Sequence, residues 1–414
     1  MKNYIIIGGG IIGLSTAYYL QKEGAQITVI DQSDISSGAS FVNAGFVSPS
    51  HFIPMAVPGM ISKGMKWMLN DSSPFYIKPR LDIDLLKWAW NFKKSATHKK
   101  VNKAIPILMD FNLLGLELYK ELKSNNEFDF QLERKGLLMY YKTEKAGEEE
   151  WEIAKRAMSM GLKVEKISLD ELKIIEPDVK LNIKGAIFFK GDAHMTPDEY
   201  MKKMYTFLKD KGVRFFTNER VIDLQISGNR IAKVKTDKRE VQADEIVLAA
   251  GAWASQITKK LGLKIPLQAG KGYHIDVYRN TGISIPTILA ETKVAVTPMQ
   301  GFTRLAGTME LGGLNHKINT KRVKSIASAA ERYYDNLHIE QQEIDRSTCG
   351  LRPCSPDGLP YIGRYSKLNN LTIATGHAMM GWGLGPATGK IISEIISDRK
   401  PSLNIDIFNP ERKF

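Results

Sequence analysis

Three glycines near the start of the chain have the spacing of a phosphate-binding turn. Gly8, Gly10 and Gly13 directly follow residues 3–7, an apolar run that is typical of a buried parallel strand. Gly8 permits a tight turn, Gly10 lacks the Cβ that would block a pyrophosphate, and Gly13 lets a helix approach the sheet. The helix expected over 12–23 would then present its N-terminal amides to the phosphates.

An acidic residue ends the next apolar run. Asp31 closes residues 25–31, so that strand, glycine turn, helix and strand follow one another as in a βαβ unit with a right-handed crossover. A carboxylate at this position accepts hydrogen bonds from an adenosine ribose, and its charge would repel the extra phosphate of NADP. The motif therefore predicts a bound dinucleotide and leaves NAD and FAD open.

Elements farther along the chain decide between the two. Residues 60–145 are mostly helical in pattern, and residues 213–251 alternate as in a β-meander that returns to the parallel sheet in an apolar strand at 245–251. Residues 345–397 have the pattern of a loop, a strand, a Gly-rich turn and a helix. An NAD dehydrogenase normally keeps its nucleotide domain contiguous, whereas these pieces are dispersed, as in a fold that wraps one long cofactor. We therefore predict FAD.

The length of 414 residues suggests two or three domains. The interleaved pattern predicts an α/β fold in which a Rossmann-like nucleotide domain alternates along the chain with a second, α+β substrate domain. The nucleotide domain is expected to comprise residues 1–50, 150–262 and 345–414, and the substrate domain residues 51–149 and 263–344.

The composition is that of an ordinary globular protein, with 43% hydrophobic and 25% charged residues. No run of 18 apolar residues predicts a membrane span, and residues 3–13 do not have the pattern of a signal peptide, so we expect a cytoplasmic protein. The two cysteines, Cys349 and Cys354, fit neither a zinc site nor a disulfide framework. We expect no metal.

The net charge of +13 is concentrated in part between residues 78 and 103. Eight basic residues lie there together with Trp88 and Trp90, and Trp67 precedes them. Lysines beside interfacial tryptophans could dock the protein on the inner face of an anionic membrane, where it would pass electrons to a quinone. A solvated helical face would give the same pattern, and both interpretations stay open.

Five motifs in this order resemble the D-amino-acid oxidase superfamily of flavoenzymes, and within it the D-amino-acid dehydrogenases and glycine oxidase. They are IIIGGGIIGLSTAYYL at the start, SGASFVNAGFVSPS at 37–50, IVLAAGAWAS at 246–255, GLRPCSPDGLPYIGR at 350–364 and TGHAMMGWGLGPATGKIISEII at 375–396. The resemblance covers nearly the whole chain. It implies a GR2-type FAD-binding domain and FAD as the cofactor.

The resemblance also implies which residues contact FAD. Small and polar residues at 36–46 would let backbone amides reach the flavin, and Val221 would meet the adenine through its backbone. A helix starting near Gly383 would point its N-terminus at the flavin ring. The expected cofactor-binding residues are Gly8, Gly10, Ile11, Ile12, Gly13, Asp31, Gln32, Ser37, Ser40, Asn43, Ala44, Gly45, Val221, Ala250, Gly251, Trp253, Arg352, Gly376, Met380, Gly381, Trp382 and Gly383.

Three residues are candidates for binding the substrate or taking part in catalysis. The resemblance implies that Arg352, in Gly-Leu-Arg-Pro, binds the substrate carboxylate. A guanidinium is planar and always charged, so its N–H groups can bind both carboxylate oxygens at once. An ion pair with Asp357 is the structural alternative. Tyr273 would donate a second hydrogen bond to the substrate or close the pocket, or is an ordinary strand aromatic. His377 could act in catalysis, contact the edge of the flavin or have a structural role.

Two positions depart from related sequences. Met379 stands where glycine oxidase-like sequences carry an arginine, which argues against a second cation in the substrate site. Gly350 stands where sarcosine oxidase-like relatives tether FAD through a cysteine, so we predict that FAD is bound non-covalently.

The resemblance implies oxidation of a small D-amino or D-imino acid by hydride transfer from Cα to flavin N5. The product would be an imine or, after hydrolysis, a 2-oxo acid, and the electrons would pass to a quinone or another acceptor. The alternative is an oxidase of glycine or sarcosine that uses oxygen. Because no RNA-binding module accompanies the flavin domain, no nucleic-acid partner is expected.

Overall fold

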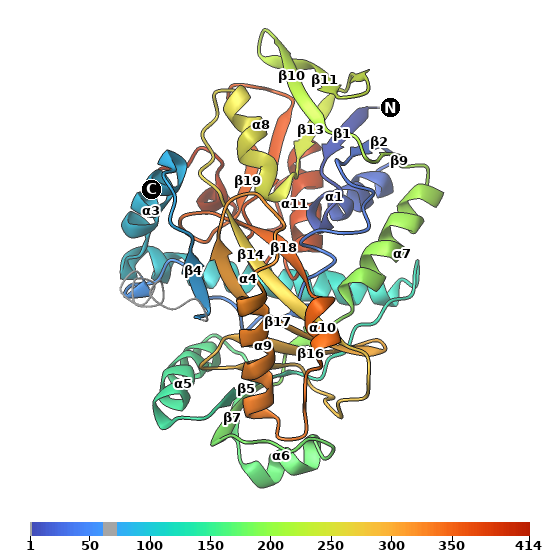
Figure 1. Ribbon diagram of the computed structural model, residues 1–414. Coiled ribbons are helices and arrows are strands. Elements are labelled where there is room, and N and C mark those ends of the chain that lie inside the picture. The colour runs from blue at the N-terminus through green and yellow to red at the C-terminus, as the bar shows by residue number, and fades with distance from the viewer. Residues whose placement is uncertain (1, 61–72) are drawn as a thin grey trace.

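The computed structural model describes residues 2–60 and 73–414 (Figure 1). Within these residues a six-stranded sheet lies at the upper right of Figure 1 and a nine-stranded sheet extends from its centre downwards. The strand order of the first sheet is β19 (Tyr361–Arg364), β20 (Leu371–Thr375), β13 (Glu245–Leu248), β1 (Asn3–Ile7), β2 (Gln26–Ile30) and β9 (Arg214–Phe216). The expected βαβ unit is therefore present, with β1 parallel to both β2 and β13.

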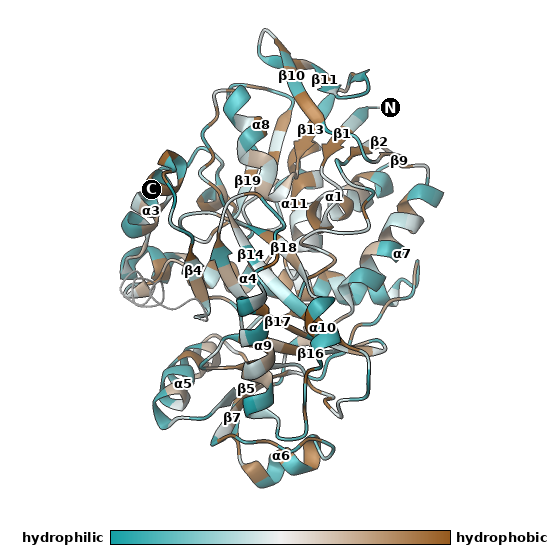
Figure 2. Cartoon of the chain, viewed as in Figure 1, coloured by the Kyte–Doolittle hydropathy of each residue, from teal (hydrophilic) through white to brown (hydrophobic). Residues whose placement is uncertain are grey.

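The central strands of the six-stranded sheet are buried on both faces, and β1 and β13 are apolar after their first residues, Asn3 and Glu245 (Figure 2). Helices α1 (Ile11–Lys22), α7 (Pro197–Asp210) and α11 (Gly385–Ile396) pack together in the same core. Close helix packing requires Gly389, where a Cβ would stand 2.4 Å from the backbone carbon of Ser15. The first and last helices of the fold thereby contact each other directly.

The expected meander over 213–251 is correct only in its middle part. Strands β10 (Val221–Ser227), β11 (Arg230–Thr236) and β12 (Glu240–Val241) form a three-stranded antiparallel sheet. Strand β9, which we expected in the meander, instead pairs parallel with β2. Its Phe215 packs against the core beside α1, so burial rather than local alternation decides its partner.

The nine-stranded sheet carries the second domain. Along its path lie β18 (Thr348–Cys354), β14 (Gln268–Val277), β17 (Phe302–Leu311), β16 (Val294–Met299), β15 (Thr287–Leu289), β5 (Leu137–Tyr141), β7 (Gly185–Phe189) and β6 (Val164–Ile167), with β4 (Phe75–Ile77) paired to β17. Helices α9 (Thr320–Tyr333) and α10 (Gln341–Asp345) contact β14, and α5 (Glu144–Ser159) contacts β5, β6 and β7. The remaining elements are β3 (Phe46–Val47), β8 (Ala193–His194), α3 (Ile83–Ser95), α4 (His98–Ser124), α6 (Leu169–Ile175), α8 (Ala254–Lys260) and short 3-10 helices at Gly251–Trp253 and Asp406–Phe408.

The sheets do not follow the expected domain boundaries everywhere. Strands β6 and β7 lie in residues 150–262, and β18 lies in residues 345–414, yet all three pair within the nine-stranded sheet. Strands β4 and β5 also interrupt the stretch 60–145, which was expected to be mostly helical. We therefore propose that the second domain includes residues 150–189 and β18, and that the chain crosses between domains more often than the sequence pattern suggests.

No helix in residues 2–60 and 73–414 combines the length and the apolar character needed to cross a bilayer.

Candidate functional site

A cavity of about 1580 Å³ lies between the two sheets. It is lined by the glycine turn after β1, by the loop at 36–44 and by strands β14, β17 and β18 of the second sheet. Pockets for single drug-sized ligands usually occupy roughly 300–1,000 Å³. The cavity therefore has room for a long cofactor and a small substrate together.

The glycine turn has the geometry that its sequence predicts. Gly8 has a positive φ of 111°, and a Cβ on Gly13 would stand 1.9 Å from the Gly8 carbonyl oxygen. The Asp31 carboxylate accepts hydrogen bonds from the Gly9 amide at 2.6 Å and from the amide and hydroxyl of Ser33, both at 2.7 Å. Asp31 thus fixes the turn itself, in addition to the ribose contact that we expect of it.

Most of the expected cofactor-binding residues line the cavity. Those that do so are Gly8, Gly10, Ile11, Ile12, Asp31, Gln32, Ser37, Ser40, Asn43, Ala44, Val221, Ala250, Gly251, Trp253, Arg352, Met380, Gly381, Trp382 and Gly383. Gly13, Gly45 and Gly376 are not in the lining: Gly13 and Gly45 permit a close approach of the Gly8 and Met195 backbones, and Gly376 lies against the Tyr361 ring. Residues from distant parts of the sequence thus meet at one site.

The turn before α11 presents unpaired amides to the cavity. The backbone N–H groups of Gly381, Trp382 and Gly383 have no acceptor among the residues that the structure describes. Helix α11 begins two residues later, at Gly385, so its positive dipole end faces the same region. The Trp382 ring packs into the core against Tyr119 and Tyr200, which leaves its backbone to face the cavity. Unpaired donors at a helix start suit an electron-rich flavin edge, so this turn fits FAD.

The glycine at the expected tethering position has no space for a side chain. A Cβ on Gly350 would stand 2.6 Å from Val42 Cγ2 and 2.9 Å from Ala39 Cα. Strand β18 and the 36–46 loop are therefore in direct contact at this point. A cysteine here would have to displace the loop, which agrees with the expectation of a non-covalent cofactor.

Arg352 lies in strand β18 and reaches the cavity across strand β14. Its Nη1 donates to the Thr308 carbonyl oxygen at 2.9 Å, and no carboxylate in the described part of the chain pairs with it. Asp357, the partner considered from sequence, instead binds Arg412 through both carboxylate oxygens, at 2.7 and 2.9 Å. Burial lowers the pKa of Arg352 from its usual value, but a guanidinium remains charged in proteins. A partly buried cation that lines a cavity without a carboxylate partner is suited to bind an anion.

The carbonyl that orients Arg352 belongs to a strained residue. Thr308 has a φ of +61°, which a β-branched side chain rarely adopts. Thr308 lies in β17 beside an irregularity in the β14–β17 pairing. Strain of this kind is retained where the surrounding structure needs a particular carbonyl direction.

Tyr273 is directed away from the role expected for it. Its hydroxyl donates to Glu310 Oε2 at 2.8 Å and lies behind the cavity wall, with Lys271 and Arg322 also close to the Glu310 carboxylate. Burial, together with Glu310, holds the pKa of Tyr273 well above its usual value. With its proton committed to Glu310, Tyr273 shapes the cavity through its ring and has no second proton to donate to a substrate.

His377 also lines the cavity, but its ring is buried. The ring Nε2 lies 3.1 Å from the Thr388 hydroxyl of α11. Burial lowers the pKa of His377 to about 3, so the imidazole is neutral at physiological pH. This geometry favours a structural role, in which His377 joins the Gly-rich turn to α11.

Two cavity residues were not anticipated. His51 follows the 37–50 motif directly, and its Nδ1 lies 3.3 Å from the Ser50 hydroxyl, which donates to Asp192 Oδ2 at 2.5 Å. Arg304 is buried in the apolar strand β17 and lines the cavity from the second sheet. A charged residue near the start of a largely apolar strand, in which Glu310 is the other charge, was the sequence signal that could have identified Arg304.

The basic stretch at 78–103 divides into a buried part and an exposed part. Trp88 is only 3% exposed and donates from Nε1 to the Cys354 carbonyl oxygen at 2.8 Å, so it belongs to the core. Trp67 lies outside the described residues. The α3 surface, as we call the exposed group, consists of Leu81, Ile83, Leu86 and Trp90 with Lys87, Lys93 and Lys94. Leu86, Trp90 and Lys93 also line the cavity.

In residues 2–60 and 73–414 no group of three His, Cys, Asp or Glu side chains is placed to hold a metal ion.

Curated relatives match the chain over nearly its whole length. The D-amino acid dehydrogenase of Helicobacter pylori is 32% identical over 412 residues, which cover 98% of this chain and 97% of that protein. The D-amino acid dehydrogenase of Vibrio vulnificus strain CMCP6 is 32% identical over 417 residues, 98% of each.

Solved structures share the fold. Glycine oxidase from Geobacillus kaustophilus has a TM-score of 0.78 at 20% identity, with 100% of both chains covered. L-proline dehydrogenase from P. horikoshii has a TM-score of 0.77 at 21% identity, with 99% of this chain and 97% of that chain covered. The model of the DAO family, described as FAD dependent oxidoreductase, matches residues 3–395. With its glycine turn, its cavity and its unpaired amides in place, the chain belongs to the DAO family of FAD-dependent oxidoreductases.

Proposed function

We propose that the protein is an FAD-dependent dehydrogenase of small amino acids, with D-amino acids or D-imino acids as substrates. The observation that carries this proposal is Arg352, a cation that faces the cavity without a carboxylate partner in the described residues. A substrate carboxylate would form an ion pair with this guanidinium. The names of the curated relatives, which are D-amino acid dehydrogenases, support the same substrate class.

The chain's own groups bind and orient the substrate. Arg352 holds the carboxylate, and the Thr308 carbonyl keeps the guanidinium in one direction. The apolar walls of the cavity favour the neutral amine over the ammonium form. Bound FAD would supply the two-electron acceptor: the Cα hydrogen would leave as a hydride, and the neutral amine would become an iminium ion, which gives the imine when it loses a proton to water. Hydride transfer from a neutral amine depends chiefly on how the substrate is oriented against the cofactor.

A substrate panel tests this function. The purified yellow protein would be assayed with a dye acceptor against D-amino acids, D-proline, glycine and sarcosine, with the L-enantiomers as matched controls. Reduction of the dye by D-amino or D-imino acids, without peroxide, is the expected result. Steady peroxide release with glycine or sarcosine in air would instead identify the oxygen-using oxidase.

The α3 surface is the proposed route to the acceptor. Exposed Leu81, Ile83 and Leu86 beside Trp90 form an apolar patch, and Lys93 and Lys94 lie 5.8 and 5.6 Å from the centre of the Trp90 ring. Apolar side chains surrounded by lysines are suited to an anionic membrane surface. Because the patch is continuous with the cavity lining, a membrane quinone could receive electrons there.

Sedimentation with vesicles tests the docking. We expect the holoprotein to sediment with phosphatidylglycerol vesicles at low salt, and not with phosphatidylcholine vesicles. The triple variant Leu81→Ser, Leu86→Ser and Trp90→Ser should lose vesicle binding. Ile174→Ser, which changes an exposed side chain on α6, should keep it. Equal sedimentation of both variants, or none of the wild type, would contradict the docking and leave the substrate proposal intact.

A further inference from the structure

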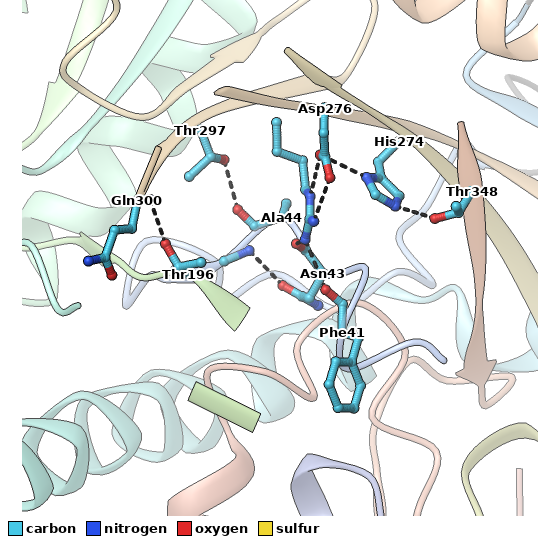
Figure 3. Close-up of polar contacts among 11 residues, drawn as sticks. Phe41, Asn43, Ala44, Thr196, His274, Asp276, Thr297, Gln300 and Thr348 are labelled. Atoms are coloured by element: carbon cyan, nitrogen blue, oxygen red, sulfur yellow. Dashed lines mark hydrogen bonds and ion pairs between the residues drawn. The ribbon is translucent and has the colours of Figure 1, made fainter. Parts of the chain in front are cut away.

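Arg304 connects the second sheet to the loop at 41–44. The side chain is only 3% exposed, and its Nε and Nη2 bind the two carboxylate oxygens of Asp276 at 2.8 and 2.9 Å. Its Nη1 donates to the carbonyl oxygens of Phe41 at 2.9 Å and Asn43 at 3.0 Å. In Figure 3 Asp276 lies on one side of these contacts, and Phe41 and Asn43 lie on the other.

Asp276 is itself held in place by His274 of the same strand, which in turn contacts Thr348 of β18. His274 Nδ1 lies 3.0 Å from Asp276 Oδ1, and the other ring nitrogen contacts the Thr348 hydroxyl (Figure 3). The carboxylate therefore cannot rotate away from Arg304 without breaking a second contact. Residues of β14, β17 and β18 thus form one polar network directed at the loop.

The next carbonyl of the loop is held in the same way. The Thr297 hydroxyl donates to the Ala44 carbonyl oxygen at 2.7 Å, and the Asn43 side chain accepts from the Gly45 amide at 2.9 Å. Three carbonyls of the loop therefore point at the second sheet. This arrangement sets the direction of the amides between them.

A trans peptide unit points its carbonyl and its amide in opposite directions. Because Arg304 holds the Asn43 carbonyl, the Ala44 amide points away from the sheet. That amide has no acceptor among the residues that the structure describes, and Asn43 and Ala44 both line the cavity. A backbone donor is therefore left available at a fixed position on the cofactor side of the loop.

We propose that Arg304, fixed by Asp276 and His274, is a positioning residue that aims the Ala44 amide at bound FAD. Lysine could not replace it, because one ammonium cannot bind a carboxylate bidentately and two carbonyls together. Loss of Arg304 should let the loop at 41–44 sample other conformations and should lower the affinity for FAD. The substrate carboxylate would still meet an intact Arg352.

Arg304→Lys, Arg304→Met and Asp276→Asn test the proposal, with Arg279→Lys as a matched control, because Arg279 forms an ion pair with Glu343 outside the cavity. We expect the FAD dissociation constant of the Arg304 variants to rise at least about tenfold. Hydrogen exchange of peptides covering 41–45 should accelerate in the apoprotein and holoprotein alike. The Arg279 variant should match the wild type in both measurements.

A role in stability alone would give a different result. The variants would then unfold at lower temperature, but the folded protein would keep its FAD affinity, its visible flavin spectrum and its exchange rates at 41–45. That result would overturn the proposal. If Arg304→Met fails to fold, Asp276→Asn keeps the guanidinium and still removes its orienting charge, so the same measurements decide the question.

Discussion

The Arg352 guanidinium lies directly over the backbone of Gly272, where a Cβ would stand 2.2 Å from Nη1 and Nη2. Gly272 is in β14 and pairs with Gly350 of β18, so Arg352 crosses a neighbouring strand to enter the cavity. The absence of a side chain on Gly272 is what allows this path.

Gly272→Ala should therefore displace Arg352 without removing it. We expect the KM for a D-amino acid to rise at least about tenfold, since a charged hydrogen bond contributes roughly 1.5–3 kcal/mol. FAD content should remain close to that of the wild type. Steady-state kinetics of Gly272→Ala and of Gly191→Ala, where a Cβ meets open space, check this. An unchanged KM in Gly272→Ala would mean that Arg352 does not need this path.

The contact between Gly350 and the 39–42 loop leads to a prediction about cofactor attachment. Because no side chain fits there, acid precipitation of the holoprotein should release all of the flavin into the supernatant. Gly350→Ala should weaken FAD binding, since its Cβ would push against Val42 and Ala39. A yellow pellet after precipitation would contradict non-covalent binding, and fluorescence of the supernatant measures the released fraction.

A buried carboxyl predicts how stability depends on pH. Burial raises the pKa of Asp192 to about 7, well above the value of about 3.9 expected in the unfolded chain. The folded state thus binds the proton more tightly. Its stability should therefore decline as pH rises between those two values, by an amount on the order of 1.4 kcal/mol for each pKa unit.

Asp192→Asn removes this ionisation while keeping an acceptor for the Ser50 hydroxyl. Urea unfolding at about pH 5 and about pH 8 should show a smaller loss of stability in the variant than in the wild type. The exposed Glu148→Gln serves as the control and should behave as the wild type does. The same change in the free energy of unfolding between the two pH values in all three proteins would refute the raised pKa of Asp192.

The sequence predicted those features that local spacing determines. The glycine turn, Asp31 and the βαβ unit were predictable because Gly8 needs a positive φ and Gly13 lies against the Gly8 carbonyl, both of which are local requirements. The FAD-binding role of residues 381–383 was predicted from the family resemblance and not from the local sequence pattern. Both sets of residues line the same cavity.

Features that depend on strand pairing could not be predicted. Tyr273 meets Glu310 because β14 pairs with β17, and nothing near either residue in the sequence indicates this partnership. Arg352 was expected in a loop, but it lies in a strand, where the β14 pairing directs it. The Arg304 network was missed for the same reason, since its members come from three strands.

Comparison of D-alanine with D-alaninamide tests the central claim most directly, because the two differ in the charge that Arg352 would bind. The wild type should prefer D-alanine in kcat/KM by at least about tenfold. Arg352→Met, with FAD still bound, should lose most of that preference, chiefly through a higher KM for D-alanine. Retention of the full preference in Arg352→Met would contradict the assignment of Arg352 as the carboxylate-binding residue.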